Sequence, residues 1–152
     1  MTYKELREKH QQEVNKLPIY WAFSDDQWRK LLAELGMTEE QAETELCNLL
    51  GGIARKSDAK YIVDTLARHR QEMQEAMKDL EFFKSAAVYE MCNHEYGINW
   101  QADYDTINAL GFDVEYSDGN ELADCGMTAE QKDVYRQARK EYFKLANEND
   151  WF

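Results

Sequence analysis

The stretch SDAKYIVDTLARHRQEMQEAMKDL, residues 57–80, sets the fold class of this chain. Its inward positions follow one another in alternating steps of four and three residues: Ile62, Leu66, His69, Met73, Ala76 and Leu80. That spacing places them on one face of an α-helix, and Ser57 or Asp58 can cap its first turn. The stretch therefore predicts the longest helix of the chain. Because His69 and Ala76 weaken the apolar stripe, we expect it to pack within the protein rather than in a coiled coil.

Further helices are predicted on both sides of this stretch. Only one Pro and seven Gly occur in 152 residues, and such a low number of breakers favours helix. A capping-box pattern, Ser or Thr followed three residues later by Glu or Gln, begins at Thr2, Ser24, Thr38 and Thr128. The predicted helices cover residues 3–16, 25–35, 39–50, 57–80, 83–94, 103–110 and 129–147.

These segments predict a mainly α-helical protein, folded as a single compact domain over residues 1–152. It has seven helices if the chain is interrupted after residue 80 and six if that helix continues. The pattern also allows one short pair of β-strands, near residues 98–100 and 112–116. The second segment alternates apolar and polar side chains, which is typical of a strand. In the competing interpretation, Asp113 caps a helix.

The stretch LLGGIARKSD, residues 49–58, is interpreted as a turn between two helices, with glycine at the end of the first. The alternative is an anion site, in which Arg55 and Lys56 accompany the N-terminus of the following helix.

Negative charge is concentrated in one third of the chain. The formal net charge is −12 at pH 7, and residues 85–131 contain ten acidic side chains and no Lys or Arg. This charge disfavours direct binding to nucleic-acid phosphates or to an anionic membrane surface, since both require basic side chains. It favours a basic partner, or only high solubility.

Two interpretations of this acidic region stay open. In the first it is a solvated surface. In the second it docks on a basic protein surface, such as the groove of a nucleic-acid enzyme, and the interleaved aromatic side chains add contacts. The carboxylates expected to make this contact are Asp103, Asp105, Asp113, Glu115, Asp118, Glu121 and Asp124. The second interpretation requires most of them to be exposed on one face.

No motif for catalysis, cofactor binding or metal binding is found. A calcium loop starting at Asp113 fails because Asp118 stands where glycine is required. The competing prediction is a small enzyme or metal-dependent regulator built around Cys92, His94 and Glu95. A Cys and a His two residues apart on a helix point to different faces, so a structural role is favoured. We expect a non-enzymatic protein with no catalytic residue, cofactor or metal.

A third alternative is a helical scaffold that self-associates through Ile62, Leu66 and Met73. The cysteines are three in number and far apart, as expected of reduced thiols in a cytoplasmic protein. The N-terminal MTYKELREKHQQEV has no apolar segment of a secretion signal, and no apolar run approaches the length of a membrane span.

Three stretches resemble a known family: LPIYWAFSDDQW (17–28), GGIARKSD (51–58) and NHEYGINWQADYDTINALGFD (93–113). Over about residues 1–115, the chain resembles a family of small acidic proteins of unknown function, encoded by bacterial mobile elements and phages. The resemblance implies no activity and no catalytic residue. It implies a genomic setting in which small acidic inhibitors of host defence are common, including anti-CRISPR proteins and DNA mimics. An inhibitor of this kind, with a nucleic-acid enzyme such as a CRISPR effector as its partner, is the leading prediction.

Overall fold

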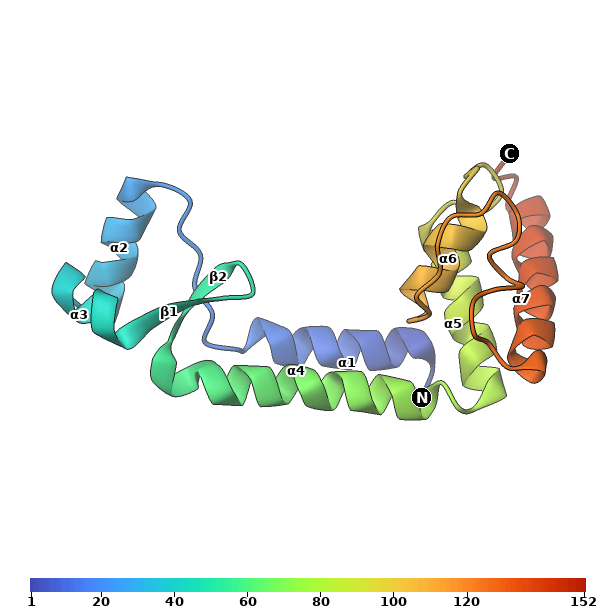
Figure 1. Cartoon of the computed structure of the whole chain (residues 1–152). Helices are drawn as coiled ribbons and strands as arrows, with labels where there is room; N and C mark the ends of the chain where they lie inside the picture. The colour runs from blue at the N-terminus through green and yellow to red at the C-terminus, as the bar shows by residue number, and fades with distance from the viewer. The chain divides into compact units, whose positions relative to one another are not determined.

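The computed structural model describes residues 1–152 and contains seven helices and one two-stranded sheet. They follow one another as α1 (Tyr3–Asn15), α2 (Asp25–Leu35), α3 (Glu39–Glu45), β1 (Leu46–Leu49), β2 (Gly52–Arg55), α4 (Lys56–Ala76), α5 (Leu80–Asn93), α6 (Ala102–Ala109) and α7 (Ala129–Glu148) (Figure 1). The predicted mainly α-helical class is confirmed. The chain divides into two compact units, one of Met1–Lys9 with Met73–Phe152 and one of His10–Glu72. The single domain over residues 1–152 stays a prediction.

Helix starts follow the capping patterns. Three of the four are complete boxes, in which the hydroxyl accepts from a backbone N–H and the third residue's side chain accepts from the cap's own N–H: Thr2 with Glu5, Thr38 with Gln41, and Thr128 with Gln131. At the fourth, Ser24 accepts from the Gln27 N–H, while the Gln27 side chain accepts from the N–H of Phe23. None of the seven helices has the length and apolar character needed to span a bilayer.

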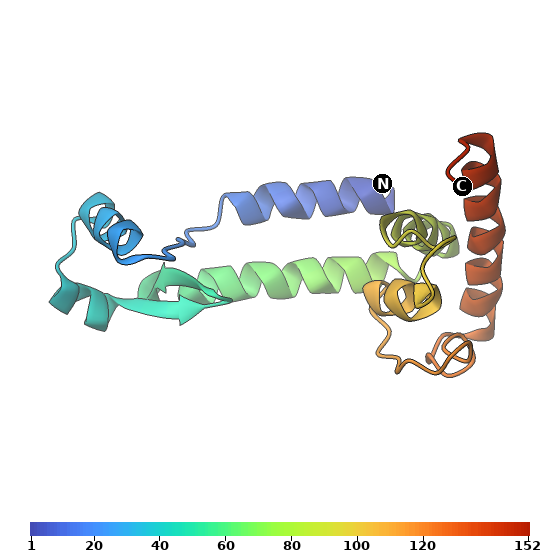
Figure 2. The same cartoon turned by 90° about the horizontal axis from the view of Figure 1, so that it is seen from above.

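A β-hairpin joins α3 to α4 in the unit His10–Glu72 (Figure 2). Its strands pair antiparallel in a register that sets Leu49 opposite Gly52. The two residues between them, Leu50 and Gly51, have φ angles of 55° and 81°. Positive φ at both central positions is the pattern of a tight two-residue hairpin turn.

The hairpin corrects two predictions, the helix over residues 39–50 and the helix–turn–helix at residues 49–58. α3 ends at Glu45, and the chain is extended from the next residue onward. The cause is pairing with a distant segment, since Tyr20 and Ile53 exchange two backbone hydrogen bonds of 2.7 and 2.8 Å. β2 therefore has backbone partners on both edges, which the local helical spacing of the leucines does not reveal.

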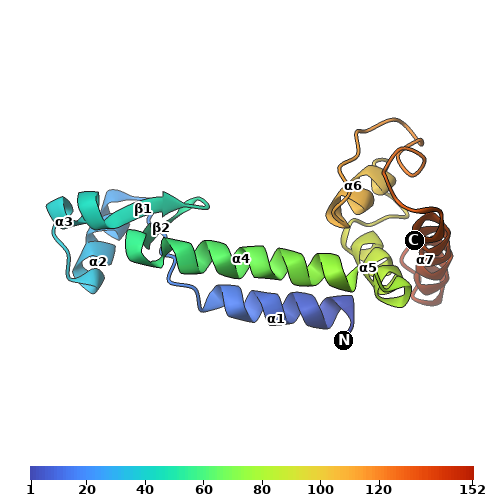
Figure 3. The ribbon, with the colours of Figure 1, turned by 60° about the horizontal axis from the view of Figure 1, so that its bottom comes forward.

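In the same unit, α1 and α4 lie side by side (Figure 3). A cluster of histidines and carboxylates joins them. The His10 and His69 rings stack with centroids 4.1 Å apart. His10 Nε2 lies 2.7 Å from a Glu72 oxygen, and His69 Nε2 lies 2.6 Å from a Glu13 oxygen. Hydrogen bonds from His69 and then Arg68 lower the pKa of Glu13 to about 2. These pairs fix how the two helices lie alongside each other.

The unit of Met1–Lys9 and Met73–Phe152 has the larger core, to which α5, α6, α7 and the start of α1 contribute. Its most deeply buried large side chains are Tyr135, Phe83, Met91 and Ile107. The predicted helix over residues 57–80 ends four residues early. Asp79 then caps α5 by accepting the Phe82 N–H at 2.8 Å, which gives seven helices.

Candidate functional site

The acidic loop, residues 112–126 between α6 and α7, is held in place by side chains and forms no strand. Asn108 takes the place of a partner strand. Its side-chain oxygen accepts from the Val114 N–H at 3.2 Å, and its amide donates to the Val114 carbonyl at 3.2 Å. Val114 itself is buried in the core. The alternation of residues 112–116 is therefore real, but the predicted strand pair with residues 98–100 is wrong, and Asp113 caps no helix.

Glu121 closes the second half of the loop. Its carboxylate accepts from the backbone N–H of Ser117 at 3.1 Å and of Gly119 at 2.9 Å. The chain between them turns through the left-handed region, with φ of 53° at Asp118 and 103° at Gly119. Because the Glu121 side chain is only 3% exposed, its predicted role as a contact residue is corrected to a loop-forming one.

Asp103 joins three segments within its unit. One carboxylate oxygen accepts from the Tyr96 hydroxyl at 2.6 Å, from the Tyr135 hydroxyl at 2.7 Å and from Arg139 at 3.1 Å. Burial, followed by the interactions with Asp103, raises the pKa of both tyrosines above the ordinary value. The Arg139 guanidinium also lies over both rings, 5.7 and 5.6 Å from their centroids. Asp103 is thus neutralised internally and ties α6 to α7.

Asp105 is also engaged within the unit. It accepts from the side-chain amide of Asn99 at 2.8 Å, and the same amide donates to the His94 carbonyl at 3.0 Å. The Asn99 oxygen in turn accepts from the Gln101 N–H at 2.9 Å. Asp105 is half-buried, so it supports the turn before α6 rather than projecting into solvent.

The remaining four predicted contact residues are exposed: Asp113, Glu115, Asp118 and Asp124. None of them forms an ion pair with a basic side chain of the chain. Asp113 and Glu115 flank the buried Val114, so both carboxylates point away from the core. These four carboxylates, named here the free carboxylates, keep their full charge toward solvent.

A pocket of about 310 Å³ lies where the turn before α6 faces the acidic loop; its lining includes Tyr96, Trp100, Asp103, Asp118 and Glu121. Trp100 is 77% exposed. The Tyr116 ring meets the Trp100 ring edge-on at 5.6 Å and the Tyr104 ring at 6.2 Å. Of the three carboxylates that line this acidic pocket, only Asp118 has no basic or backbone N–H partner. An aromatic face beside such a carboxylate attracts a cation, so the chemistry of the pocket suits a basic side chain.

The three residues of the competing enzyme prediction do not converge. His94 Nε2 lies 3.4 Å from Glu90, a buried carboxylate that also accepts from Tyr3 and Arg7. Cys92 and Glu95 line a different pocket, of about 320 Å³. Partial burial raises the pKa of the Cys92 thiol, which disfavours the nucleophilic thiolate.

No group of three or more His, Cys, Asp or Glu side chains is arranged to hold a metal ion. The apolar stripe of the scaffold alternative lies against the chain's own cores. Ile62 is fully buried and Leu66 packs beside it, while Met73, which belongs to the other unit, packs against the core of its own unit. The stripe is therefore occupied within the chain.

Fold and site together define a mainly α-helical, acidic protein in which the acidic pocket, with its aromatic side chains, lies beside the acidic loop. The chain belongs to a family of unknown function, DUF7659, whose profile matches residues 2–135. The predicted resemblance to a family of unknown function is confirmed to that extent, and the match extends beyond residue 115 to include the whole acidic loop. Searches of curated proteins and of solved structures gave no significant match.

Proposed function

We propose that this protein is a non-enzymatic binding protein whose acidic loop and acidic pocket dock on a basic surface of another protein. The observation that carries the proposal is the state of the free carboxylates. They are exposed and unpaired, in a stretch of 47 residues, 85–131, without any Lys or Arg. A partner would gain their attraction without first breaking ion pairs within the chain.

The aromatic side chains beside the loop supply the second component of binding. Trp100 is largely exposed, and Tyr116 packs against its ring. Exposed Trp and Tyr beside charged groups are typical of the residues that carry most of the binding energy of an interface. Charge therefore guides the encounter, and the aromatic rings hold the complex.

For the partner, we propose a protein that binds nucleic acid. Such proteins carry basic grooves matched to rows of phosphates, and rows of carboxylates compete for the same side chains. The finer proposal is that the protein inhibits host defence as a DNA mimic, with a CRISPR effector as one such partner, and that it originates from a phage or mobile element. It rests on the family resemblance of the sequence and on the charge.

The test is a pull-down from bacterial lysate at rising salt concentration. The variant Asp113→Asn, Glu115→Gln, Asp118→Asn, Asp124→Asn removes the free carboxylates. A control variant of equal charge, Glu75→Gln, Glu81→Gln, Asp133→Asn, Glu148→Gln, neutralises four exposed carboxylates elsewhere in the same unit. We expect a basic nucleic-acid-binding protein to be retained by the parent and the control and lost by the first variant.

Competition with duplex DNA tests the proposal of a DNA mimic. Duplex DNA added to the retained complex should displace the protein, because a DNA mimic occupies the DNA-binding groove of its partner. Equal loss of the partner from both variants would mean that net charge, and not the acidic loop, holds the partner. Retention of the same partners by the parent and the first variant would reduce the loop to a solvated surface.

A further inference from the structure

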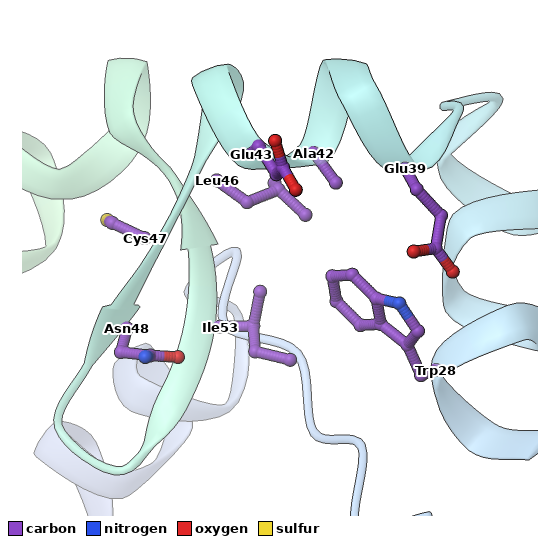
Figure 4. A pocket seen from close by; sticks show the side chains of 8 residues that line it. All are labelled: Trp28, Glu39, Ala42, Glu43, Leu46, Cys47, Asn48 and Ile53. Atoms are coloured by element: carbon purple, nitrogen blue, oxygen red, sulfur yellow. The ribbon is translucent and has the colours of Figure 1, made fainter. Parts of the chain in front are cut away.

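Another pocket, named here the Trp28 pocket, lies wholly within the unit His10–Glu72 (Figure 4). It has a volume of about 290 Å³. α2, α3 and both strands of the hairpin supply its lining: Trp28, Glu39, Ala42, Glu43, Leu46, Cys47, Asn48 and Ile53. Figure 4 shows the indole of Trp28 facing Ile53 across the pocket, with Glu43 and Leu46 along a third side. The Cys47 sulfur points away from it.

The walls combine three kinds of chemistry. Ala42 and Leu46 are buried and contribute the apolar part of the lining. Trp28 is only half-buried, so part of its ring faces the opening. Glu39 and Glu43 are four residues apart on α3, which places both carboxylates on one face of that helix.

The pocket contains no cation of its own. Both Glu39 and Glu43 are exposed, and neither forms an ion pair with a Lys or Arg of the chain. Arg29, the basic residue next to Trp28, pairs instead with Asp26. The carboxylates are therefore uncompensated beside an aromatic ring, an arrangement that attracts a cation.

We propose that the Trp28 pocket binds one basic side chain, an Arg or a Lys, of a partner protein. The aliphatic part of that side chain lies against Leu46 and Ile53, and its cationic end lies at the Trp28 ring between Glu39 and Glu43. Size supports one side chain, because small-molecule pockets usually measure about 300–1,000 Å³ and this one is at the lower limit. The inference does not depend on the acidic loop, which belongs to the other unit.

The experiment is an NMR titration of the full-length protein with short Gly-Ser peptides that carry one Arg or one Lys. Peptides with citrulline or norleucine at the same position keep the shape and lack the charge. We expect the charged peptides to shift the Trp28 indole N–H and the Ile53 methyl signals, with dissociation constants near the millimolar range that weaken with salt. The uncharged peptides are expected to bind at least about tenfold more weakly.

Variants locate the site. Glu39→Gln with Glu43→Gln is expected to weaken binding about tenfold, and Trp28→Leu is expected to abolish it. Glu34→Gln with Glu45→Gln, an equal charge change at exposed positions of the same unit, is expected to leave it unchanged. Neutralising the free carboxylates is also expected to leave the Trp28 shifts unchanged, so this proposal and the proposed function fail separately.

Any of the following outcomes would overturn the inference. The first is the absence of any Trp28 shift with either charged peptide. The second is equal binding of the charged and uncharged peptides, or an unchanged affinity in the Glu39→Gln, Glu43→Gln variant. The third is binding of free spermine at far lower concentration than either peptide, which would assign the pocket to a polyamine instead of a protein side chain.

Discussion

The acidic pocket and the Trp28 pocket each have one wall made of non-helical chain, and the two walls are held in different ways. The acidic loop is fixed by side chains that bond to its backbone, with Asn108 at Val114 and Glu121 at Gly119. The hairpin beside the Trp28 pocket is fixed by backbone pairing of β2, with β1 on one edge and Tyr20 on the other, and by close steric fit at Gly52. Single polar side chains therefore control the first wall, and backbone geometry controls the second.

The largest effect is expected at alkaline pH and in the unit that contains the acidic loop, because three of its tyrosine hydroxyls are hydrogen-bonded to carboxylates, Tyr3 to Glu90 and both Tyr96 and Tyr135 to Asp103. Burial and the Glu90 carboxylate raise the pKa of Tyr3 to about 12, and the pKa values of Tyr96 and Tyr135 are raised by burial and Asp103. Between about pH 10 and 12 the unfolded chain loses these protons first, so the free energy of unfolding falls as pH rises. The shift of Tyr3 alone corresponds to about 3 kcal/mol.

Urea unfolding, followed by circular dichroism at several pH values from about 8 to 11.5, measures this loss. Replacing Tyr3 and Tyr96 by Phe removes two of the titrating groups and should flatten the pH dependence, although it also deletes their hydrogen bonds. Tyr61→Phe, at an exposed position, serves as the control. A free energy of unfolding that stays constant up to about pH 11.5 would contradict the prediction.

The second effect is the loss of the Glu121 carboxylate. Glu121→Ala leaves two backbone N–H groups, of Ser117 and Gly119, without their acceptor, and a hydrogen bond to a charged group contributes about 1.5–3 kcal/mol. We expect a destabilisation of about 3 kcal/mol and faster amide exchange across residues 115–121. Glu115→Ala, at an exposed carboxylate of the same loop, is expected to change stability by less than about 0.5 kcal/mol. Equal effects of the two substitutions would show that the loop is not held by Glu121.

The wrong secondary-structure predictions fall at these two walls. Helix starts depend on residues three positions apart, so the capping boxes at Thr38 and Thr128 could be found from the sequence. The hairpin depends on Tyr20 meeting Ile53, a contact between distant segments that no local pattern reports. At residues 112–116 the error was the reverse: a strand was predicted where none forms. The alternating segment is held by the side chain of Asn108, so it needs no second strand.

For the candidate site too, the sequence showed the local features and missed those that depend on contacts between residues far apart in the chain. The excess of carboxylates and the aromatic residues interleaved with them were visible in the sequence, although the exposure of Trp100 was not, and four of the seven predicted contact residues are exposed. The sequence did not reveal that Asp103 meets Arg139, 36 residues further along the chain, or that Glu121 turns inward. The Trp28 pocket was missed because the helix predicted over residues 39–50 leaves no hairpin to form its wall.

The third effect tests the steric fit of the hairpin. A Cβ added at Gly52 would lie 2.6 Å from the Ile19 side chain and 3.1 Å from the Tyr20 carbonyl oxygen. Because the Tyr20 backbone is itself paired with Ile53, it has little room to move. Gly52→Ala is expected to cost about 1–3 kcal/mol of unfolding free energy, the usual range for overpacking.

Gly97→Ala is the matched control. There the added Cβ would come within 2.3 Å of the Phe152 ring, which is closer still. Phe152 is 62% exposed, however, so its ring can rotate away. Thermal unfolding of both variants should show the smaller loss for Gly97→Ala; the reverse order would mean that the hairpin yields more easily than the exposed aromatic side chain.

The smallest effect is a gain of stability at the hairpin turn. Leu50 has a φ of 55°, a left-handed conformation that costs most side chains about 1–2 kcal/mol. Leu50→Asn creates Asn-Gly, the pair that two-residue hairpin turns favour, and little apolar contact is lost because Leu50 is 62% exposed. We expect a stabilisation of about 0.5–1 kcal/mol, measured by urea unfolding. Leu50→Ala keeps the strained backbone and should give no gain. If Asn destabilises the chain while Ala does not, the left-handed backbone at residue 50 does not lower the stability of the hairpin. Backbone geometry would then not be what controls this wall.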